Sequence, residues 1–97
     1  MSLRERLWEI AWEIERLPVW RDIAGTVAWL LLVNKTEAEL ALAVKHILPR
    51  ELERLEGIYA YYMKHWDELD EIMRCRVQDI QKVAEKIRKI ILEVCTA

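Results

Sequence analysis

Few side chains in this sequence are spaced so that they could carry out chemistry. His65 and Glu68 stand one helical turn apart and could supply two ligands to a metal site in a helical bundle. Such a site needs ligands from several helices, and the only other histidine is His46. We therefore expect His65 to lie on a polar surface and the protein to bind no metal.

The two cysteines show no sign of reactivity either. Cys75 and Cys95 have no histidine close in sequence that would make either one a nucleophile. In one continuous helix they would lie roughly 30 Å apart, too far for a disulfide within the chain. The sequence also contains no glycine-rich phosphate loop and no metalloprotease or kinase motif. We therefore expect a protein that is not an enzyme and uses no cofactor.

One arginine interrupts the most regular apolar pattern in the chain. Arg76 occupies a seam position between Met73 and Ile80 at three-and-four spacing. Because an unpaired buried charge is strongly destabilising, it needs a partner such as Asp79 or an acidic residue of another chain. We interpret Arg76 as a residue that sets the register of an assembly. Two alternatives stay open: its stem carries the charge out to solvent, or it binds an anion together with Arg74, Gln78 or Lys82.

Composition and periodicity predict an all-α fold. The sequence has only two glycines and two prolines, and it is rich in Glu, Lys, Arg and aliphatic residues, which favours helices over a sheet. The sequence also has only one asparagine and two glutamines, and such a scarcity of amide side chains is typical of thermophile proteins. We expect one helical domain, residues 1–97, in which a cap region over 1–48 precedes one long helix over 49–95. The cap region should contain three short helices, over residues 2–17, 18–33 and 36–47.

The length of the last helix predicts self-association. It would be roughly 65 Å long, whereas each short helix measures only roughly 15–25 Å and cannot cover it. Either the chain kinks near residues 64–68 or a second copy covers the exposed part, and the unbroken apolar phase favours the second copy. We expect a homo-oligomer, a dimer or larger, that forms a multi-helix bundle. Its interface would comprise Leu69, Met73, Arg76, Ile80, Val83, Ile87, Ile90 and Val94.

The bulky aromatic residues are predicted to fill the core. The sequence has five tryptophans and no phenylalanine, and the tryptophans stand at core spacing rather than forming a stacking platform for bases. The uncharged stretch 23–33 is also assigned to the core, because a membrane span needs about twenty apolar residues. Since no signal-peptide pattern is present, we expect a cytoplasmic protein that does not enter a membrane.

Residues 27–56 suggest a second hypothesis. The apolar positions from Leu40, Ala41 and Val44 to Leu52 and Leu55 resemble a helix-turn-helix of the winged-helix kind. The resemblance implies a scaffold helix over residues 36–44 and a recognition helix that opens at Pro49. It would place three basic side chains near a DNA duplex: Lys45, Arg50 and Arg54.

Two functional hypotheses therefore follow from the sequence. The favoured one is a non-enzymatic helical protein whose long C-terminal helix mediates self-association or binds a protein partner. The alternative is a small dimeric DNA-binding transcriptional regulator. They differ in one measurable property, because binding to DNA weakens steeply with salt.

Overall fold

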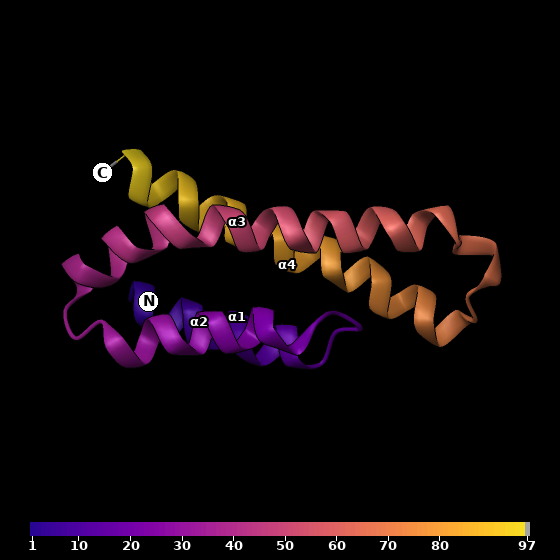
Figure 1. Cartoon of the computed structure of the whole chain (residues 1–97), viewed down its shortest axis with the longest axis horizontal. Coiled ribbons are helices and arrows are strands. Elements are labelled where there is room, and N and C mark those ends of the chain that lie inside the picture. The colour runs from indigo at the N-terminus through magenta and orange to yellow at the C-terminus, as the bar shows by residue number, and fades with distance from the viewer. Residues whose placement is uncertain (97) are drawn as a thin grey trace.

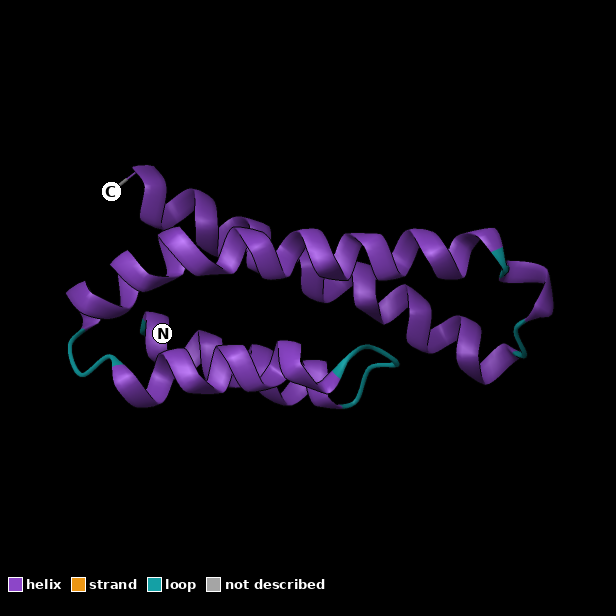
Figure 2. Cartoon of the chain, viewed as in Figure 1, coloured by secondary structure: helices purple, strands orange, loops and turns teal. Residues whose placement is uncertain are grey.

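The computed structural model describes residues 1–96, so Ala97, the last residue of the predicted domain, lies outside the described residues. Residues 1–96 contain helices and loops and no strand, which confirms the all-α prediction (Figure 2). Short and long helices both occur, and the C-terminal helix is one of the long ones. In chain order the elements are α1 (Leu3–Glu15), α2 (Arg21–Val33), α3 (Glu37–Lys64), the short 3₁₀ helix η1 (Trp66–Glu68) and α4 (Glu71–Thr96).

The four α-helices form two antiparallel hairpins that pack on each other. α1 runs against α2, and α3 runs against α4 (Figure 1). α1 also contacts α3 and α4, and α2 contacts α3, so the core lies between the two hairpins. The bundle measures 44 × 23 × 21 Å. The turn that joins α3 to α4 projects beyond the α1–α2 hairpin (Figure 1).

The predicted continuous helix over residues 49–95 is wrong. α3 ends at Lys64, and the chain reverses direction between His65 and Asp70 before α4 begins. The reversal falls where the sequence allows a kink, near residues 64–68, which was the alternative to a second copy that covers the helix. An unbroken apolar phase is compatible with a reversal, because each helix needs only to turn its own stripe toward the core.

Side chains at the reversal hold its geometry. Asp70 Oδ1 accepts a hydrogen bond from the Met73 N–H at 2.8 Å and so caps the start of α4. Arg74 Nε donates to the backbone carbonyl of Trp66 at 3.1 Å. The Arg74 guanidinium also lies 5.3 Å from the centroid of the Trp66 ring, within the range of a cation–π contact. These local contacts define the direction in which α4 leaves the turn.

Pro49 lies inside α3, not at a corner between two helices. Proline lacks an N–H and its ring crowds the preceding turn, so it bends a helix that runs through it. The ribbon of α3 bends in its first half (Figure 1). Leu48, the last residue of the predicted cap region, is fully buried within α3. The expected boundary between a cap region and a long helix falls inside one helix.

Polar contacts complete the helix ends. Ser2 caps α1 and Thr36 caps α3, and each hydroxyl accepts a hydrogen bond from the backbone N–H three residues further on. At the C-terminal end of α2, Arg4 donates to the carbonyl oxygens of Leu31 at 2.7 Å and Asn34 at 2.5 Å. A cation is favourable there because the helix dipole is negative at the C-terminus.

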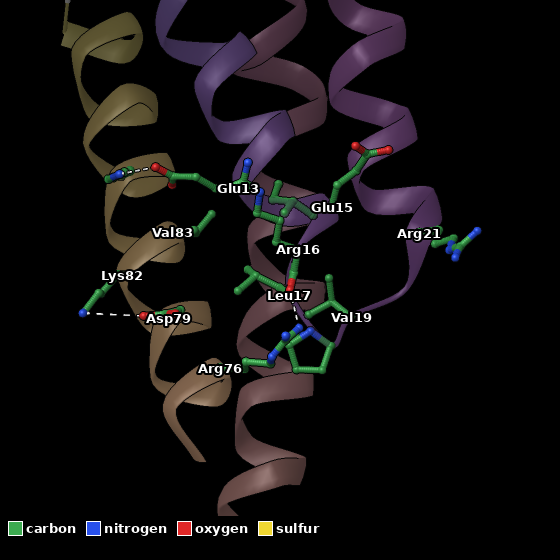
Figure 3. Close-up of a pocket in the computed structure, with 13 residues that line it drawn as sticks. Glu13, Glu15, Arg16, Leu17, Val19, Arg21, Arg76, Asp79, Lys82 and Val83 are labelled. Atoms are coloured by element: carbon green, nitrogen blue, oxygen red, sulfur yellow. Dashed lines mark hydrogen bonds and ion pairs between the residues drawn. The ribbon is translucent and has the colours of Figure 1, made fainter. Parts of the chain in front are cut away.

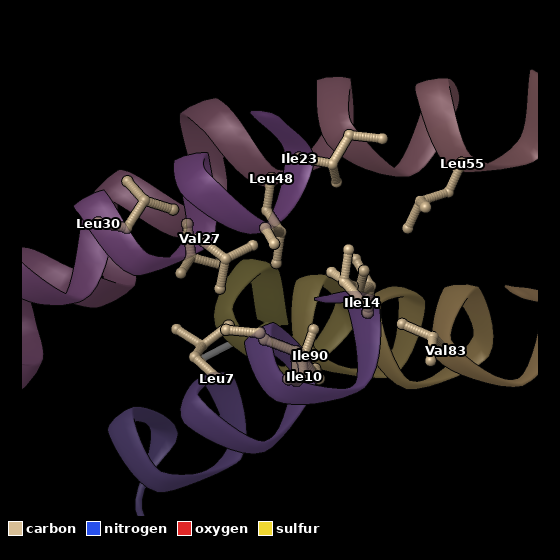
Figure 4. Packing of buried hydrophobic residues seen from close by; sticks show 14 of the residues in the cluster. Leu7, Ile10, Ile14, Ile23, Val27, Leu30, Leu48, Leu55, Val83 and Ile90 are labelled. Atoms are coloured by element: carbon tan, nitrogen blue, oxygen red, sulfur yellow. The ribbon is translucent and has the colours of Figure 1, made fainter. Parts of the chain in front are cut away.

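The core consists almost wholly of aliphatic side chains drawn from all four α-helices (Figure 4). Burying one such side chain contributes about 1.5–3 kcal/mol. Because both hairpins contribute to the same cluster, neither has a separate core. Its largest members are Leu7, Ile10, Ile14, Ile23, Val27, Leu30, Leu31, Leu40, Val44, Leu48, Leu55, Ile80, Val83, Ile87 and Ile90.

Ion pairs join the first helix to the last. Both terminal nitrogens of Arg6 on α1 donate to the carboxylate of Glu93 on α4. Lys86 Nζ donates to Glu13 Oε1 at 2.6 Å further along the same two helices. The hydrogen bond from Arg6 holds the pKa of Glu93 below its usual value. These pairs lie at the surface, so they add modestly to the packing of α1 on α4.

Replacing Ile87 by alanine should lower the free energy of unfolding by about 2–5 kcal/mol, because Ile87 is fully buried and its removal leaves a cavity. Urea unfolding followed by circular dichroism measures the change. Leu92→Ala on the same helix is the matched control, since Leu92 is 58% exposed and its loss should change stability little. Equal effects of the two substitutions would contradict the packing of α4 within the chain.

Replacing Glu93 by glutamine should reduce the loss of stability in acid. Because the folded-state pKa of Glu93 is lowered, the unfolded chain binds the proton more readily, and the stabilisation is present above pH 4.5 and lost as the pH falls below it. Urea midpoints at about pH 7 and about pH 3.5 give the slope. Glu53→Gln is the control, because Glu53 is exposed and forms no ion pair within residues 1–96. An unchanged slope for Glu93→Gln would contradict the link between α1 and α4.

Candidate functional site

The predicted oligomer seam lies mostly inside the single chain. Ile80, Val83, Ile87 and Ile90 are buried by other helices of the same molecule. Three further members of the seam are half-buried: Leu69, Met73 and Val94. Because the chain reverses between α3 and α4, α4 is covered by its own chain and is not an exposed rod that a second copy must cover.

Arg76 is exposed and reaches the end of α1. Its Nη1 donates to the backbone carbonyl of Arg16, the residue that ends α1, at 3.3 Å (Figure 3). The expected partner Asp79 instead faces Lys82, with its Oδ1 3.5 Å from the ammonium nitrogen. The charge thus stays in water while it complements the negative end of the α1 dipole. Arg76 therefore matches the alternative in which its stem carries the charge to solvent.

An open hollow surrounds Arg76 between α1, the α1–α2 loop and α4 (Figure 3). Of the predicted anion-binding partners, only Lys82 lines this hollow with Arg76; Arg74 lies at the α3–α4 turn and Gln78 lines a different depression. Figure 3 shows Lys82 and Arg21 pointing away from Arg76 on opposite sides. The basic side chains do not converge, so the hollow lacks the geometry of a phosphate site.

The residues singled out for DNA contact lie on one uninterrupted helix. α3 runs from Glu37 to Lys64, so the turn that a helix-turn-helix requires is absent. Lys45 and Arg50 are exposed. Arg54 is engaged within the chain: its guanidinium nitrogens lie 2.5 Å from Asp22 Oδ2 and 3.0 Å from Glu51 Oε2. It also lies 5.2 Å from the centroid of the Trp20 ring.

The prediction that the tryptophans fill the core is wrong: four of the five are exposed, and Trp66, half-buried at the α3–α4 turn, is not part of the core cluster. Trp8, Trp12, Trp20 and Trp29 are 42%, 60%, 61% and 53% exposed. The core is filled instead by leucine, isoleucine and valine, which leaves the indoles outside it. Tryptophan at a partner surface combines a large apolar area with few rotatable bonds. Exposed indoles in this number point to a surface that contacts something else.

Three of these indoles belong to one surface on the outer side of the α1–α2 hairpin. On α1, Trp8, Ala11 and Trp12 stand at i, i+3 and i+4; on α2, an apolar stripe of the same kind runs opposite them. A groove between the helices is lined by residues of both stripes. We define the tryptophan face by the members of the two stripes: Trp8, Ala11, Trp12, Gly25, Ala28, Trp29 and Leu32.

Gly25 lies in the groove of the tryptophan face, and nothing within the chain requires a glycine there. A Cβ added to Gly25 would meet no atom within 4 Å, and the residue has no positive φ. Glycine in a helix interior costs about 0.5–1 kcal/mol relative to alanine. The missing side chain instead deepens the groove beside Trp12.

A smaller apolar pocket surrounds the only other glycine of the sequence. Gly57 on α3 also has open space where a Cβ would lie. It faces Trp20 and Tyr61 across a pocket whose other lining residues are Pro18, Val19, Ile58 and Tyr62. This pocket involves one exposed tryptophan, whereas the tryptophan face presents three.

A second apolar stripe on each of two helices was the sequence signal for this face. A helix that uses one stripe for its core has no internal need for another. Residues 8 and 12 and residues 25, 28, 29 and 32 keep helical spacing outside the core positions, whereas Ala11, between the two indoles of α1, is itself part of the core. A second stripe at this spacing therefore indicates an exposed apolar surface.

No protein-family model, curated protein or solved structure matched this chain. No described helix is both long enough and apolar enough to cross a membrane. Within residues 1–96, His65 Nδ1 lies 2.9 Å from Glu68 Oε2, and no group of three potential metal ligands comes together. The tryptophan face is therefore the candidate functional site.

Replacing Arg76 by leucine should lower the free energy of unfolding by about 0.5–1 kcal/mol, because α1 loses the cation at its C-terminal end. Self-association, followed by light scattering behind a sizing column, should not change. Arg50→Leu is the control, since Arg50 is exposed and lies on α3, away from the end of α1. A changed oligomeric state for Arg76→Leu would support a register role instead.

Proposed function

We propose that this protein is a non-enzymatic helical self-association protein whose docking surface is the tryptophan face. The supporting observation is the second apolar stripe on α1 and on α2, which exposes three indoles, of which Trp8 and Trp12 line a groove between the helices. The proposal keeps the function inferred from the sequence and moves the surface from α4 to the α1–α2 hairpin.

The size of the exposed patch supports a docking role. By the usual area of a buried aromatic side chain, the exposed parts of Trp8, Trp12, Trp29 and Leu32 amount to a few hundred Å². That is comparable with the largest apolar patches of monomeric proteins, which are often functional. One partner in a standard interface contributes about 800 Å², so this patch would form its apolar centre and charged neighbours its rim.

A second copy suits this face because projections and hollow occur together on it. Trp12 projects beside the groove that Gly25 deepens, and both belong to the same surface. A two-fold symmetric pair requires such self-complementarity, since the same patch serves on both sides. The DNA-binding alternative gains no comparable support from α3, where Arg54 is already paired.

Alanine at the two glycines separates stability from association. Gly25→Ala and Gly57→Ala should each raise the free energy of unfolding by about 0.5–1 kcal/mol, because alanine favours a helix and meets no atom of the chain. Only Gly25→Ala should weaken self-association, by about tenfold, because its methyl group fills the groove of the face. Urea unfolding gives the first quantity and sedimentation equilibrium across a dilution series the second.

The two glycine variants also show which outcomes would contradict the proposal. Weaker association of Gly57→Ala alone would place the interface at the pocket of Trp20 and Tyr61. A chain that stays monomeric at every concentration would contradict self-association. Adding a random DNA duplex at low salt tests the alternative, and a salt-sensitive complex would support it.

A further inference from the structure

The tryptophan face carries opposite charges at its two ends. On α1, Glu5, Glu9, Trp12 and Arg16 follow one line at steps of four, three and four. The line is therefore acidic near the start of α1 and basic near its end. Arg21 begins α2 and lines the same groove as Arg16 and Glu15, so this end carries two basic side chains and one acidic one.

These end charges are largely unpaired. Glu9, Arg16 and Arg21 are exposed, and none of them forms an ion pair within residues 1–96. Elsewhere on the bundle, some charged side chains, such as Arg6 and Lys86, have acidic partners of the same chain, and others, such as Glu53, have none within residues 1–96. The charges around the tryptophan face thus remain free to pair with another molecule.

We infer that two copies pair antiparallel through the tryptophan face, with Glu9 of each copy opposite Arg16 of the other. This inference rests on the self-association proposed above and specifies its geometry. A parallel pairing would bring Arg16 and Arg21 against the same residues of the second copy, and like charges at short range are unfavourable. Rotation about a two-fold axis at right angles to α1 places the acidic end over the basic end instead.

The spacing of the face fits one position of that axis. Glu9 and Arg16 are seven residues, or about 10 Å, apart along α1, and Trp12 lies close to the midpoint. On α2, Gly25 lies midway between Arg21 and Trp29, four residues from each. Trp12 and Gly25 line the same groove, so the two Trp12 indoles would meet at the axis where neither copy has a side chain at position 25.

The same axis gives the outer indole a partner. It would place Trp29 of one copy opposite Arg21 of the other, because both are four residues from the midpoint at Gly25. A guanidinium over an indole is a favourable cation–π pair. Each half of the pair would thus contain one carboxylate–guanidinium contact and one guanidinium–indole contact around an apolar centre. The charges would set the direction of pairing, and the indoles would supply most of the buried apolar area.

A charge exchange tests this arrangement. Glu9→Arg alone and Arg16→Glu alone should each weaken homodimerisation about tenfold at low salt, since each creates two like-charge contacts per pair. An equimolar mixture of the two variants should recover wild-type affinity. In that heterodimer the arginine introduced at position 9 faces the glutamate introduced at position 16, and the other Glu9–Arg16 contact is native. The double variant E9R/R16E should also recover. Sedimentation equilibrium with one variant fluorescently labelled measures homodimer and heterodimer separately.

The controls keep the two proposals distinguishable. Circular dichroism and urea midpoints should show every variant folded, since neither side chain forms an ion pair within residues 1–96. If Gly25→Ala weakens dimerisation but the mixture recovers nothing, the face is the interface and the antiparallel pairing is wrong. If the wild-type chain never dimerises, both proposals fail. Salt screens the exposed charges, so at high salt the mixture should no longer dimerise more tightly than the single variants, and wild-type dimers should persist but weaken. That result would support charge-directed pairing.

Discussion

The reversal of the chain at Asp70 is the constraint on which the rest of the bundle depends. α4 carries a continuous stripe of isoleucine and valine that must be removed from water, and only the turn brings it against α1 and α3. Asp70 caps the new helix, and Arg74 holds the turn through the Trp66 carbonyl and ring. Once α4 is folded back, Ile80 and Ile87 close a cluster to which both hairpins contribute. Neither hairpin has a separate core.

Filling that cluster with aliphatic side chains has a consequence at the surface. α1 and α2 each turn one stripe inward, where leucine, isoleucine and valine pack closely with the residues of α3 and α4. Their other apolar stripes, with Trp8, Trp12 and Trp29, remain outside. The α1–α2 hairpin is thus apolar on two sides, one of which is satisfied within the chain. The proposed function follows from the other side, the tryptophan face, whose indoles are left exposed.

Two of the arginines that the sequence suggests as functional residues, Arg76 and Arg54, have structural partners. Arg76 complements the C-terminal end of α1, as Arg4 does for α2, and Arg54 joins α3 to Asp22 of α2. Neither partner could be read from the sequence, because sixty residues separate Arg76 from Arg16 and thirty-two separate Arg54 from Asp22. The charges proposed to direct pairing, Glu9 and Arg16, share one helix, and their alignment with Trp12 follows from helical spacing alone.

Local signals in the sequence determined the helical class, the helix starts at Ser2 and Thr36, and which residues of α4 need burial. A further local signal at the reversal was present: basic Lys64 and His65 end α3, and acidic residues around Asp70 begin α4, as helix dipoles favour. The apolar phase runs on through this charge pattern, and by itself it predicts a single long helix. Only the tertiary structure decided what covers each stripe. Periodicity reports that a side chain must leave water, whereas the identity of the covering surface depends on contacts between distant segments. For the stripe of α4 the cover is the same chain, whereas the indoles of the tryptophan face are left exposed.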